Sequence, residues 1–178
     1  MPAAYRLDVE LLDSDPPIWR TVSVPDDTPL DRLHRVLQTV MGWEDSHLHR
    51  FETTDGTSYQ LPFEGDLDGD EDERGVRLDA LLAVPGDALL YEYDFGDGWE
   101  HEVELEADEA DGPGHPVCLD GAGACPPEDS GGTWRYNEIR PAFTDPSHPE
   151  HAELTEWLGG PFDPDRFDVA AVNHALGG

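Results

Sequence analysis

The stretch 91–105, with the sequence YEYDFGDGWEHEVEL, decides the fold, because two runs of alternating residues flank a Gly-Asp-Gly centre. This pattern is typical of a β-hairpin. We expect a three-residue loop over 96–98, with Gly98 at positive φ. A slip of one residue would bury the glutamates, because strand side chains alternate between the two faces. The expected register gives the hairpin one apolar face, with the pairs Phe95–Trp99, Tyr93–His101, Tyr91–Val103 and Leu89–Leu105.

The opposite face of this hairpin is acidic. In the expected register Glu92 lies across from Glu102, and Asp94 lies across from Glu100. Like charges that face each other on neighbouring strands destabilise the pair. Water, salt or an arginine on a neighbouring strand would offset this repulsion, and so would a bound cation or a basic partner.

The composition is strongly acidic. The 178 residues carry a formal charge of −31, from 41 acidic residues and 10 basic residues, all of which are arginines. Nucleic-acid binding relies on lysines and arginines that neutralise phosphates, so direct nucleic-acid binding is not expected. A basic protein is the partner that this charge favours.

The sequence shows no charged and apolar leader and no apolar run near the length of a membrane span. We therefore expect a soluble, cytoplasmic protein. In that compartment the two cysteines, Cys118 and Cys125, would be reduced rather than joined in a disulfide.

The remaining patterns predict an α+β fold, in which hairpins build a mixed or antiparallel sheet. Apolar residues alternate over 5–11 and 18–24, which predicts a second hairpin. Helical spacing over 30–41 predicts a helix across the sheet, with Thr28 as the N-cap and Gly42 as the stop.

A single domain over 1–178 is expected. Within it, the acidic run 64–74 is expected to be a mobile, solvated loop. The segments 115–118 and 124–132 are too rich in proline and glycine for regular structure. The C-terminal part, 133–178, is predicted to form short helices, the last of them capped by Asp168.

Two groups of residues are candidate sites. The first contains His47, His49, Asp94, Asp97 and His101. If the central hairpin packs beside the strand that begins at Leu48, the three histidines of this group converge. With a carboxylate they could then bind a divalent metal or perform acid–base chemistry. Otherwise His101 is a core histidine bonded to a tyrosine hydroxyl, and Asp97 is a turn former.

The second group contains His115, Cys118, Cys125, Glu128 and Asp129. Thiolates and imidazoles are zinc ligands, so a divalent metal such as zinc is the cofactor that this group predicts. The group lacks the paired C-x-x-C spacing of strong zinc sites, and the alternative is that both cysteines pack in loops.

Five motifs resemble the plasmid pRiA4b ORF-3-like family over nearly the whole chain: WR at 19–20, GW at 42–43, HLHRF at 47–51, YDFGDGWEH at 93–101 and CPPEDSGG at 125–132. The resemblance implies an α+β fold and a link with mobile elements, where some members have been labelled as transposon passenger or resolvase-like proteins. It implies no activity. The chain departs from the family pattern at Arg135, where a glycine is common, and in its acidic run 64–74.

Two hypotheses of different class follow. The first is an acidic, non-enzymatic binding or accessory module. The second is a metal-dependent hydrolase or nuclease-like enzyme that uses the histidine and aspartate set. A resolvase-like role finds no support, since the sequence shows no basic recognition helix.

Overall fold

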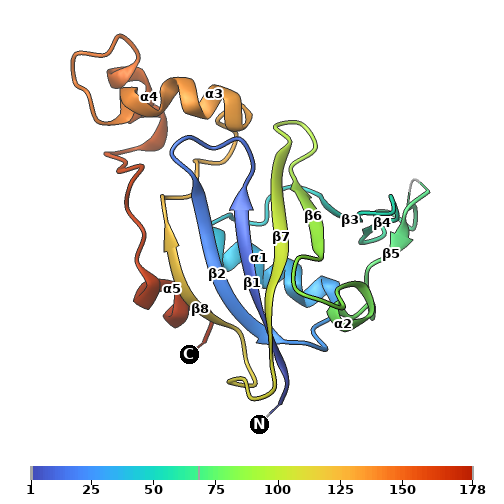
Figure 1. The fold of residues 1–178 in the computed structure, drawn as a ribbon. Helices are drawn as coiled ribbons and strands as arrows, with labels where there is room; N and C mark the ends of the chain where they lie inside the picture. The colour runs from blue at the N-terminus through green and yellow to red at the C-terminus, as the bar shows by residue number, and fades with distance from the viewer. Residues whose placement is uncertain (1, 68, 178) are drawn as a thin grey trace.

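The fold is known from a computed structural model, which describes residues 2–67 and 69–177. Its centre is an eight-stranded sheet in the order β5-β4-β3-β6-β7-β1-β2-β8 (Figure 1). Neighbouring strands are antiparallel except for β4 and β5, which run parallel. The strands are β1 Ala4–Leu11, β2 Ile18–Pro25, β3 His49–Thr53, β4 Ser58–Gln60, β5 Glu71–Asp72, β6 Ala88–Tyr93, β7 Trp99–Glu109 and β8 Val117–Ala122. The expected α+β class is confirmed.

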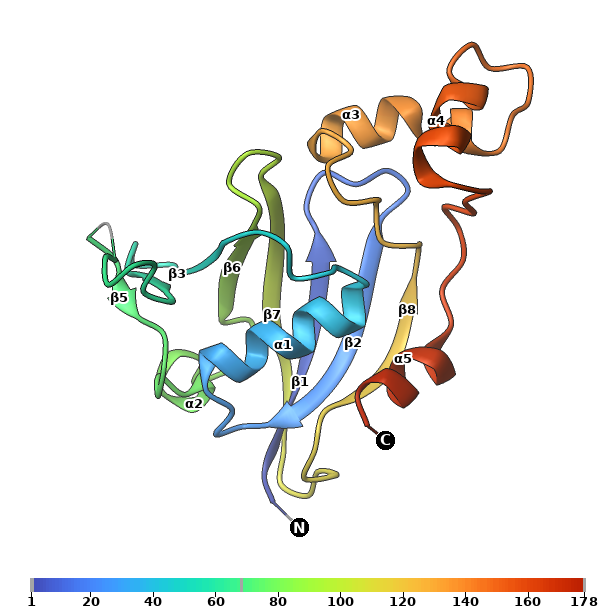
Figure 2. The same cartoon turned by 180° about the vertical axis from the view of Figure 1, so that it is seen from behind.

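One helix lies across one face of this sheet, as predicted. Helix α1, Leu30–Met41, runs obliquely over the strands and buries its apolar side against them (Figure 2). It ends at Gly42, which has a φ of 109°. The predicted N-cap is wrong by one residue: Pro29 precedes the first turn, and the Thr28 hydroxyl donates to the Pro25 carbonyl instead (2.6 Å).

The other helices are short. A single turn, α2 (Leu78–Leu81), precedes the central hairpin. The C-terminal helices lie beyond the end of the sheet and beside its β8 edge (Figures 1 and 2). They are α3 Gly132–Ile139, the 3-10 turn η1 Arg140–Phe143, α4 His151–Leu158 and α5 Val169–Ala175, the last capped by Asp168 as predicted.

The central hairpin, β6 and β7, keeps the predicted faces but not the predicted register. Tyr93 pairs with Trp99 and Tyr91 pairs with His101, a shift of two residues that keeps the strand side chains of the predicted apolar face buried. The exception is Phe95, which lies in the connection and is 41% exposed, so its predicted pairing with Trp99 is wrong. The connection is therefore the five residues 94–98. Asp94 starts it at a φ of 61°, and its carboxylate accepts hydrogen bonds from the Gly96 and Asp97 amides. Gly98 has the expected positive φ of 68°.

Two segments are more ordered than the sequence suggested. The acidic run 64–74 contains β5, and its Glu73 is fully buried, so this run is not simply a solvated loop; Asp68 lies outside the described residues. The proline-containing segment 115–118 leads into β8, the edge strand that pairs with β2. Because an edge strand needs only one partner, β8 tolerates the glycine at 121.

Arg20, from β2, joins three parts of the molecule. Its buried guanidinium donates to the Val40 and Met41 carbonyls at the end of α1, and to the Ala122 and Gly123 carbonyls after β8. Burial lowers the pKa of Arg20 to about 10. The carbonyl dipoles at the helix end stabilise its positive charge. The start of the 125–132 loop is thereby fixed beside the end of α1.

Candidate metal site

One histidine and three carboxylates meet beside the central hairpin. The Nε2 atom of His47 lies 2.8 Å from Asp129 Oδ1, 3.6 Å from Asp94 Oδ2 and 3.8 Å from Glu128 Oε2. We call these four residues the His47 cluster. Ligand atoms of His47, Asp94 and Asp129 all lie within 4.8 Å of one another, and no other three His, Cys, Asp or Glu side chains do so within the described part of the chain.

Three segments that are distant in sequence supply the cluster. His47 lies between α1 and β3, Asp94 begins the hairpin loop, and Glu128 and Asp129 lie between β8 and α3. The pairing of β3 with β6 fixes the first two segments, because the amide of Asp94 donates to the Leu48 carbonyl (2.8 Å). His47 and Asp94 therefore meet where β3 and β6 lie side by side.

Asp97 holds the third segment against the hairpin loop. Its carboxylate accepts a hydrogen bond from the Gly131 amide (3.0 Å). The next residue, Gly132, approaches so closely that a Cβ atom there would lie 2.6 Å from the Asp97 carbonyl oxygen, and its φ of 89° also favours glycine. The glycines of the CPPEDSGG motif thus allow the loop that carries Glu128 and Asp129 to reach His47.

Glu128 is oriented by hydrogen bonds to only one of its oxygens. Oε1 accepts from the Tyr93 hydroxyl (2.9 Å) and from the Glu44 amide (2.8 Å), which leaves Oε2 facing His47. Burial, with a further contribution from the Glu128 carboxylate, raises the pKa of Tyr93 to about 12. Tyr93 therefore stays protonated and keeps donating to Glu128.

Asp94 is arranged in the same way. Its Oδ1 accepts the amides of Gly96 (3.0 Å) and Asp97 (3.3 Å), while Oδ2 faces His47. Asp94 is only 7% exposed. Aspartate tolerates the left-handed backbone better than most residues, and both Asp94 and Asp129 adopt it, at a φ of 61°. Two of the three carboxylates are therefore buried or nearly so, with one oxygen fixed and the other directed at the same point.

The atoms that face each other in the cluster do not satisfy each other. His47 Nε2 and Glu128 Oε2 are buried, and neither has a hydrogen-bond partner among the described residues. The 2.8 Å contact between His47 and Asp129 lacks hydrogen-bond geometry, although the distance is short. Buried polar atoms usually have partners. A neutral imidazole nitrogen and carboxylate oxygens all offer lone pairs, so a cation is the partner that this arrangement fits.

His49, two residues along the chain, belongs to a different environment. Its Nε2 lies 2.7 Å from Glu73 Oε1, and its ring stacks on that of His34 at a centroid distance of 3.6 Å. His34 in turn contacts the Tyr91 hydroxyl (2.7 Å) and Asp45 (2.8 Å). Burial, followed by the effect of His49, lowers the pKa of His34 to about 4, although Asp45 opposes this shift. His34 is therefore neutral at pH 7.

His101 is a core residue. It is fully buried, accepts a hydrogen bond from the Trp43 indole (3.1 Å) and donates to the Tyr91 carbonyl (3.0 Å). Burial lowers the pKa of His101 to about 4, which keeps the ring neutral. The predicted bond to a tyrosine hydroxyl is thus replaced by a bond to a backbone carbonyl. His47, His49 and His101 each have separate partners, so the three histidines do not form one site.

The predicted cysteine group is divided in space. His115 is exposed and contacts the Pro113 carbonyl (2.9 Å), whereas the two cysteines are free thiols at other places. Cys118 is buried in β8, and Cys125 packs against Gly42, where an added Cβ would lie 3.0 Å from the Cys125 Cβ atom. Burial raises the pKa of both thiols. From this group only Glu128 and Asp129 belong to the His47 cluster.

Sequence reasoning named all four members of the cluster but split them between two groups. The sequence showed no sign of Glu73, the buried partner of His49, because Glu73 lies in a run of acidic residues where nothing distinguishes it from its neighbours. The sequence signal that could have joined the two groups is the pattern of aspartates and glycines in two of the motifs. DFGDG and PPEDSGG both place aspartates within two residues of glycines, which is typical of tight loops.

An α+β protein with a histidine–carboxylate cluster between its hairpin loop and the CPPEDSGG loop is the class that fold and site define. Residues 3–171 match the family described as plasmid pRiA4b ORF-3-like protein, and the chain belongs to that family.

Two relatives are similar to this chain over nearly its whole length. The chain is 44% identical over 173 residues to "Uncharacterized protein y4hQ" of Sinorhizobium fredii (strain NBRC 101917 / NGR234), which covers 96% of this chain and 87% of that protein. It is also similar to a protein of unknown function, MM3350 from Methanosarcina mazei Go1. That crystal structure superposes with a TM-score of 0.84 at 34% identity, and the match covers 95% of this chain and 97% of the other.

Within the described residues, no helix has both the length and the apolar character needed to cross a membrane.

Proposed function

We propose that this protein is a divalent-metal-binding module and that the His47 cluster is its metal site. The observation that carries the proposal is the meeting of unsatisfied atoms: His47 Nε2 and Glu128 Oε2 are buried and face each other without hydrogen-bond partners among the described residues. Asp94 Oδ2 lies 3.6 Å from the same nitrogen. Bringing three carboxylates together without a cation is unfavourable, because like charges repel strongly where water is excluded. A bound ion removes that repulsion.

The ligand set favours particular ions. Carboxylate oxygens suit Mg²⁺, Ca²⁺ and Mn²⁺, whereas an imidazole nitrogen suits Zn²⁺ and the later transition metals. A set with one imidazole and up to three carboxylates fits Mn²⁺ and Zn²⁺ better than Mg²⁺ or Ca²⁺. The hydrogen bonds to Glu128 Oε1 and Asp94 Oδ1 hold the ligands in place before the ion arrives.

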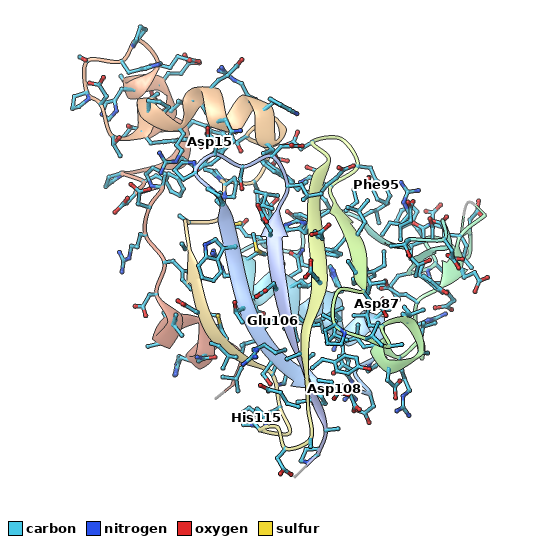
Figure 3. The ribbon with its side chains drawn as sticks, in the orientation of Figure 1. Asp15, Asp87, Phe95, Glu106, Asp108 and His115 are labelled. Atoms are coloured by element: carbon cyan, nitrogen blue, oxygen red, sulfur yellow. The ribbon has the colours of Figure 1, made fainter. Side chains whose placement is uncertain are left out.

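Calorimetric titration tests this proposal. Protein stripped with a chelator is titrated with Mn²⁺, Zn²⁺, Mg²⁺ and Ca²⁺, and Mn²⁺ or Zn²⁺ is expected to bind with a stoichiometry of one. Asp94→Asn and Asp129→Asn should each weaken the affinity at least about tenfold. Asp108→Asn is the matched control, because Asp108 lies on β7 at the opposite end from Phe95 and the hairpin loop (Figure 3). Equal affinity in all four proteins, or no binding in any of them, would refute the metal site.

A metal-dependent hydrolase would use the same ion to activate a water molecule. The titration therefore also tests the metal binding that a hydrolase of this kind requires. A location in the cytoplasm and a link with mobile elements stay predictions.

A second function, the docking of a basic protein, is favoured by the face of the sheet that α1 does not cover. On this face acidic residues stand directly opposite each other: Glu10 pairs with Glu102, Asp8 with Glu104 and Glu92 with Glu100. Figure 3 shows Glu106 over the same face. A partner that presents arginines and lysines there would neutralise these like-charged pairs.

The two binding functions can be separated. A nona-arginine peptide is used as the basic probe, at low and high NaCl concentrations. We expect the triple variant Glu10→Gln/Glu102→Gln/Glu104→Gln to bind it more weakly at low salt, whereas Asp129→Asn should bind it like the wild type. Binding that is insensitive to both salt and the triple variant would contradict docking on this face.

A further inference from the structure

The face of the sheet that α1 does not cover contains an open hollow of about 600 Å³, where β7, β1, β2 and β8 lie side by side. Its volume falls within the range of ligand sites. A tryptophan and four carboxylates are among the residues that line it: Trp19, Asp8, Glu10, Glu106 and Asp120. An aromatic ring with carboxylates around it is a setting that suits an organic cation.

The hollow forms because small side chains lie beside Trp19. Trp19 and Thr21 point to the same face of β2, since side chains alternate along a strand. On the neighbouring strand β8, Trp19 pairs with Ala122, and Thr21 pairs with Asp120. The short side chains of Ala122 and Thr21 leave room beside the indole, and Trp19 is only half-buried. A flat group can therefore reach the ring.

Three carboxylates at the hollow carry a charge that no basic side chain balances. Asp8 Oδ1 accepts a hydrogen bond from the Thr21 hydroxyl (2.8 Å), and Asp120 Oδ1 accepts one from the Gly121 amide (2.8 Å). The second oxygen of each carboxylate stays available. Within the described residues, Asp8, Glu10 and Asp120 form no ion pair with an arginine or a histidine. All three side chains reach solvent.

One arginine also lines the hollow, but its charge is already balanced. The guanidinium of Arg6 lies 3.1 Å from Glu106 Oε2 and 3.3 Å from Glu109 Oε1. Glu106 therefore neutralises Arg6, and the other three carboxylates leave the hollow negative. A cation is the charge type that this field favours.

The shape of the hollow favours one kind of cation. A guanidinium is planar and weakly hydrated, so it can stack on an indole while its N–H groups reach carboxylates at the edge of the ring. An ammonium group is a compact, strongly hydrated charge and gains less from stacking. The same contact already occurs inside this protein, where the guanidinium carbon of Arg20 lies 3.8 Å from the centre of the Phe167 ring.

We infer that this hollow, which we call the Trp19 hollow, receives an arginine side chain of a basic partner protein. The guanidinium stacks on the Trp19 indole and pairs with Glu10 on the β1 side and with Asp120 on the β8 side. The inference rests on the proposed docking of a basic protein on this face. It adds a preference: the acidic pairs attract positive charge of any kind, whereas Trp19 selects arginine over lysine.

Two peptides of equal charge, nona-arginine and nona-lysine, test this preference. Each is titrated into the full chain at low NaCl concentration and followed by calorimetry. Both should bind, and nona-arginine should bind at least about fivefold more tightly. Trp19→Leu should reduce this ratio to about twofold or less, mainly by weakening nona-arginine. The indole N–H signal that is missing from the NMR spectrum of Trp19→Leu belongs to Trp19, and nona-arginine should shift it more than nona-lysine does.

Three further variants complete the experiment. Asp120→Asn removes a carboxylate beside the indole and should weaken nona-arginine about threefold, and nona-lysine less. Trp134→Leu, at a 74% exposed tryptophan of α3, and Glu156→Gln, on α4, are the matched controls and should change neither affinity. Thermal denaturation checks that Trp19→Leu is folded; Asp120→Asn, at an exposed residue, tests the same hollow if it is not.

The outcomes separate this inference from the docking on which it rests. If both peptides bind with equal affinity, or if Trp19→Leu or Asp120→Asn leaves the preference for arginine intact, docking on the acidic face stands and the Trp19 hollow is overturned as its arginine site. The same conclusion follows if Trp134→Leu lowers the preference as much as Trp19→Leu. If neither peptide binds at low salt, docking and the arginine site are both overturned.

Discussion

His47 and His49 stand two residues apart in one motif, yet their surroundings differ in kind. The His49 side chain is 6% exposed, and its partner Glu73 is 0% exposed; the two share a close hydrogen bond. The His47 side chain is 29% exposed and faces three carboxylates without one well-formed hydrogen bond to them. A satisfied pair contributes to the stability of the fold, whereas unsatisfied groups held in place by others are typical of a binding site. Substitutions in the His49–Glu73 pair should therefore affect stability, whereas substitutions in the His47 cluster should affect metal binding.

The largest effect is expected at the satisfied pair. His49→Phe leaves the buried Glu73 carboxylate without its donor, so the free energy of unfolding should fall by about 3–5 kcal/mol. His47→Phe should change it by no more than about 1 kcal/mol in metal-free protein, because nothing buried loses a bond. Urea denaturation measures both.

The double variant His49→Phe/Glu73→Leu is the control for this prediction. It removes the charge together with its partner and should recover much of the loss. Equal losses for His47→Phe and His49→Phe would show that the contrast between the two histidines is wrong.

The next largest effect is expected from acid, which should lower the free energy of unfolding through two other buried histidines, His34 and His101. The pKa values of His34 and His101 are both lowered to about 4 by burial, whereas an unfolded histidine titrates near 6.5. Between these values the unfolded chain binds more protons, so stability falls as the pH falls. At pH 5 each histidine should cost about 2 kcal/mol relative to neutral pH. Denaturation curves at pH 5.0 to 7.0 in a chelator measure this slope, and a flat profile would contradict the buried, neutral state of both rings.

Metal bound at the His47 cluster should stabilise the folded protein. At a free Mn²⁺ or Zn²⁺ concentration one hundred times the dissociation constant, binding to the folded state adds about 2.7 kcal/mol. The increase in melting temperature should fall to about half or less in Asp94→Asn at the same metal concentration. It should be retained in His49→Asn at a temperature where that variant is folded. An increase of the same size in Asp94→Asn would place the ion elsewhere.

The sequence predicted the parts of this molecule that depend on local pattern. The buried face of the central hairpin, the first hairpin and the extent of α1 follow from alternation and helical spacing, which a chain expresses within a few residues. The exact hairpin register did not follow, because the turn depends on one side chain, that of Asp94, bonding the amides of Gly96 and Asp97.

The site followed only in part, for a related reason. His47, Asp94, Glu128 and Asp129 come from three loops, and their meeting depends on the pairing of β3 with β6 and on the approach of Gly132 to Asp97. Such contacts between distant segments leave no periodicity in the sequence. Glu73 shows the same limit, since its burial depends on β5 joining β4.

The smallest effect is expected where unsatisfied carboxylates are exposed. Glu102 faces Glu10 on one strand and lies on the solvent side of the sheet, so water screens most of the repulsion. Glu102→Gln should therefore raise the free energy of unfolding by only about 0.2–0.5 kcal/mol at low salt, and by less in 1 M NaCl. Glu156→Gln, on the exposed side of α4, is the matched control. Glu73 is buried and Glu102 is exposed, so removing the charge of Glu102 should have only a small effect. A gain of more than about 1 kcal/mol for Glu102→Gln would mean that the open face is less hydrated than a free surface.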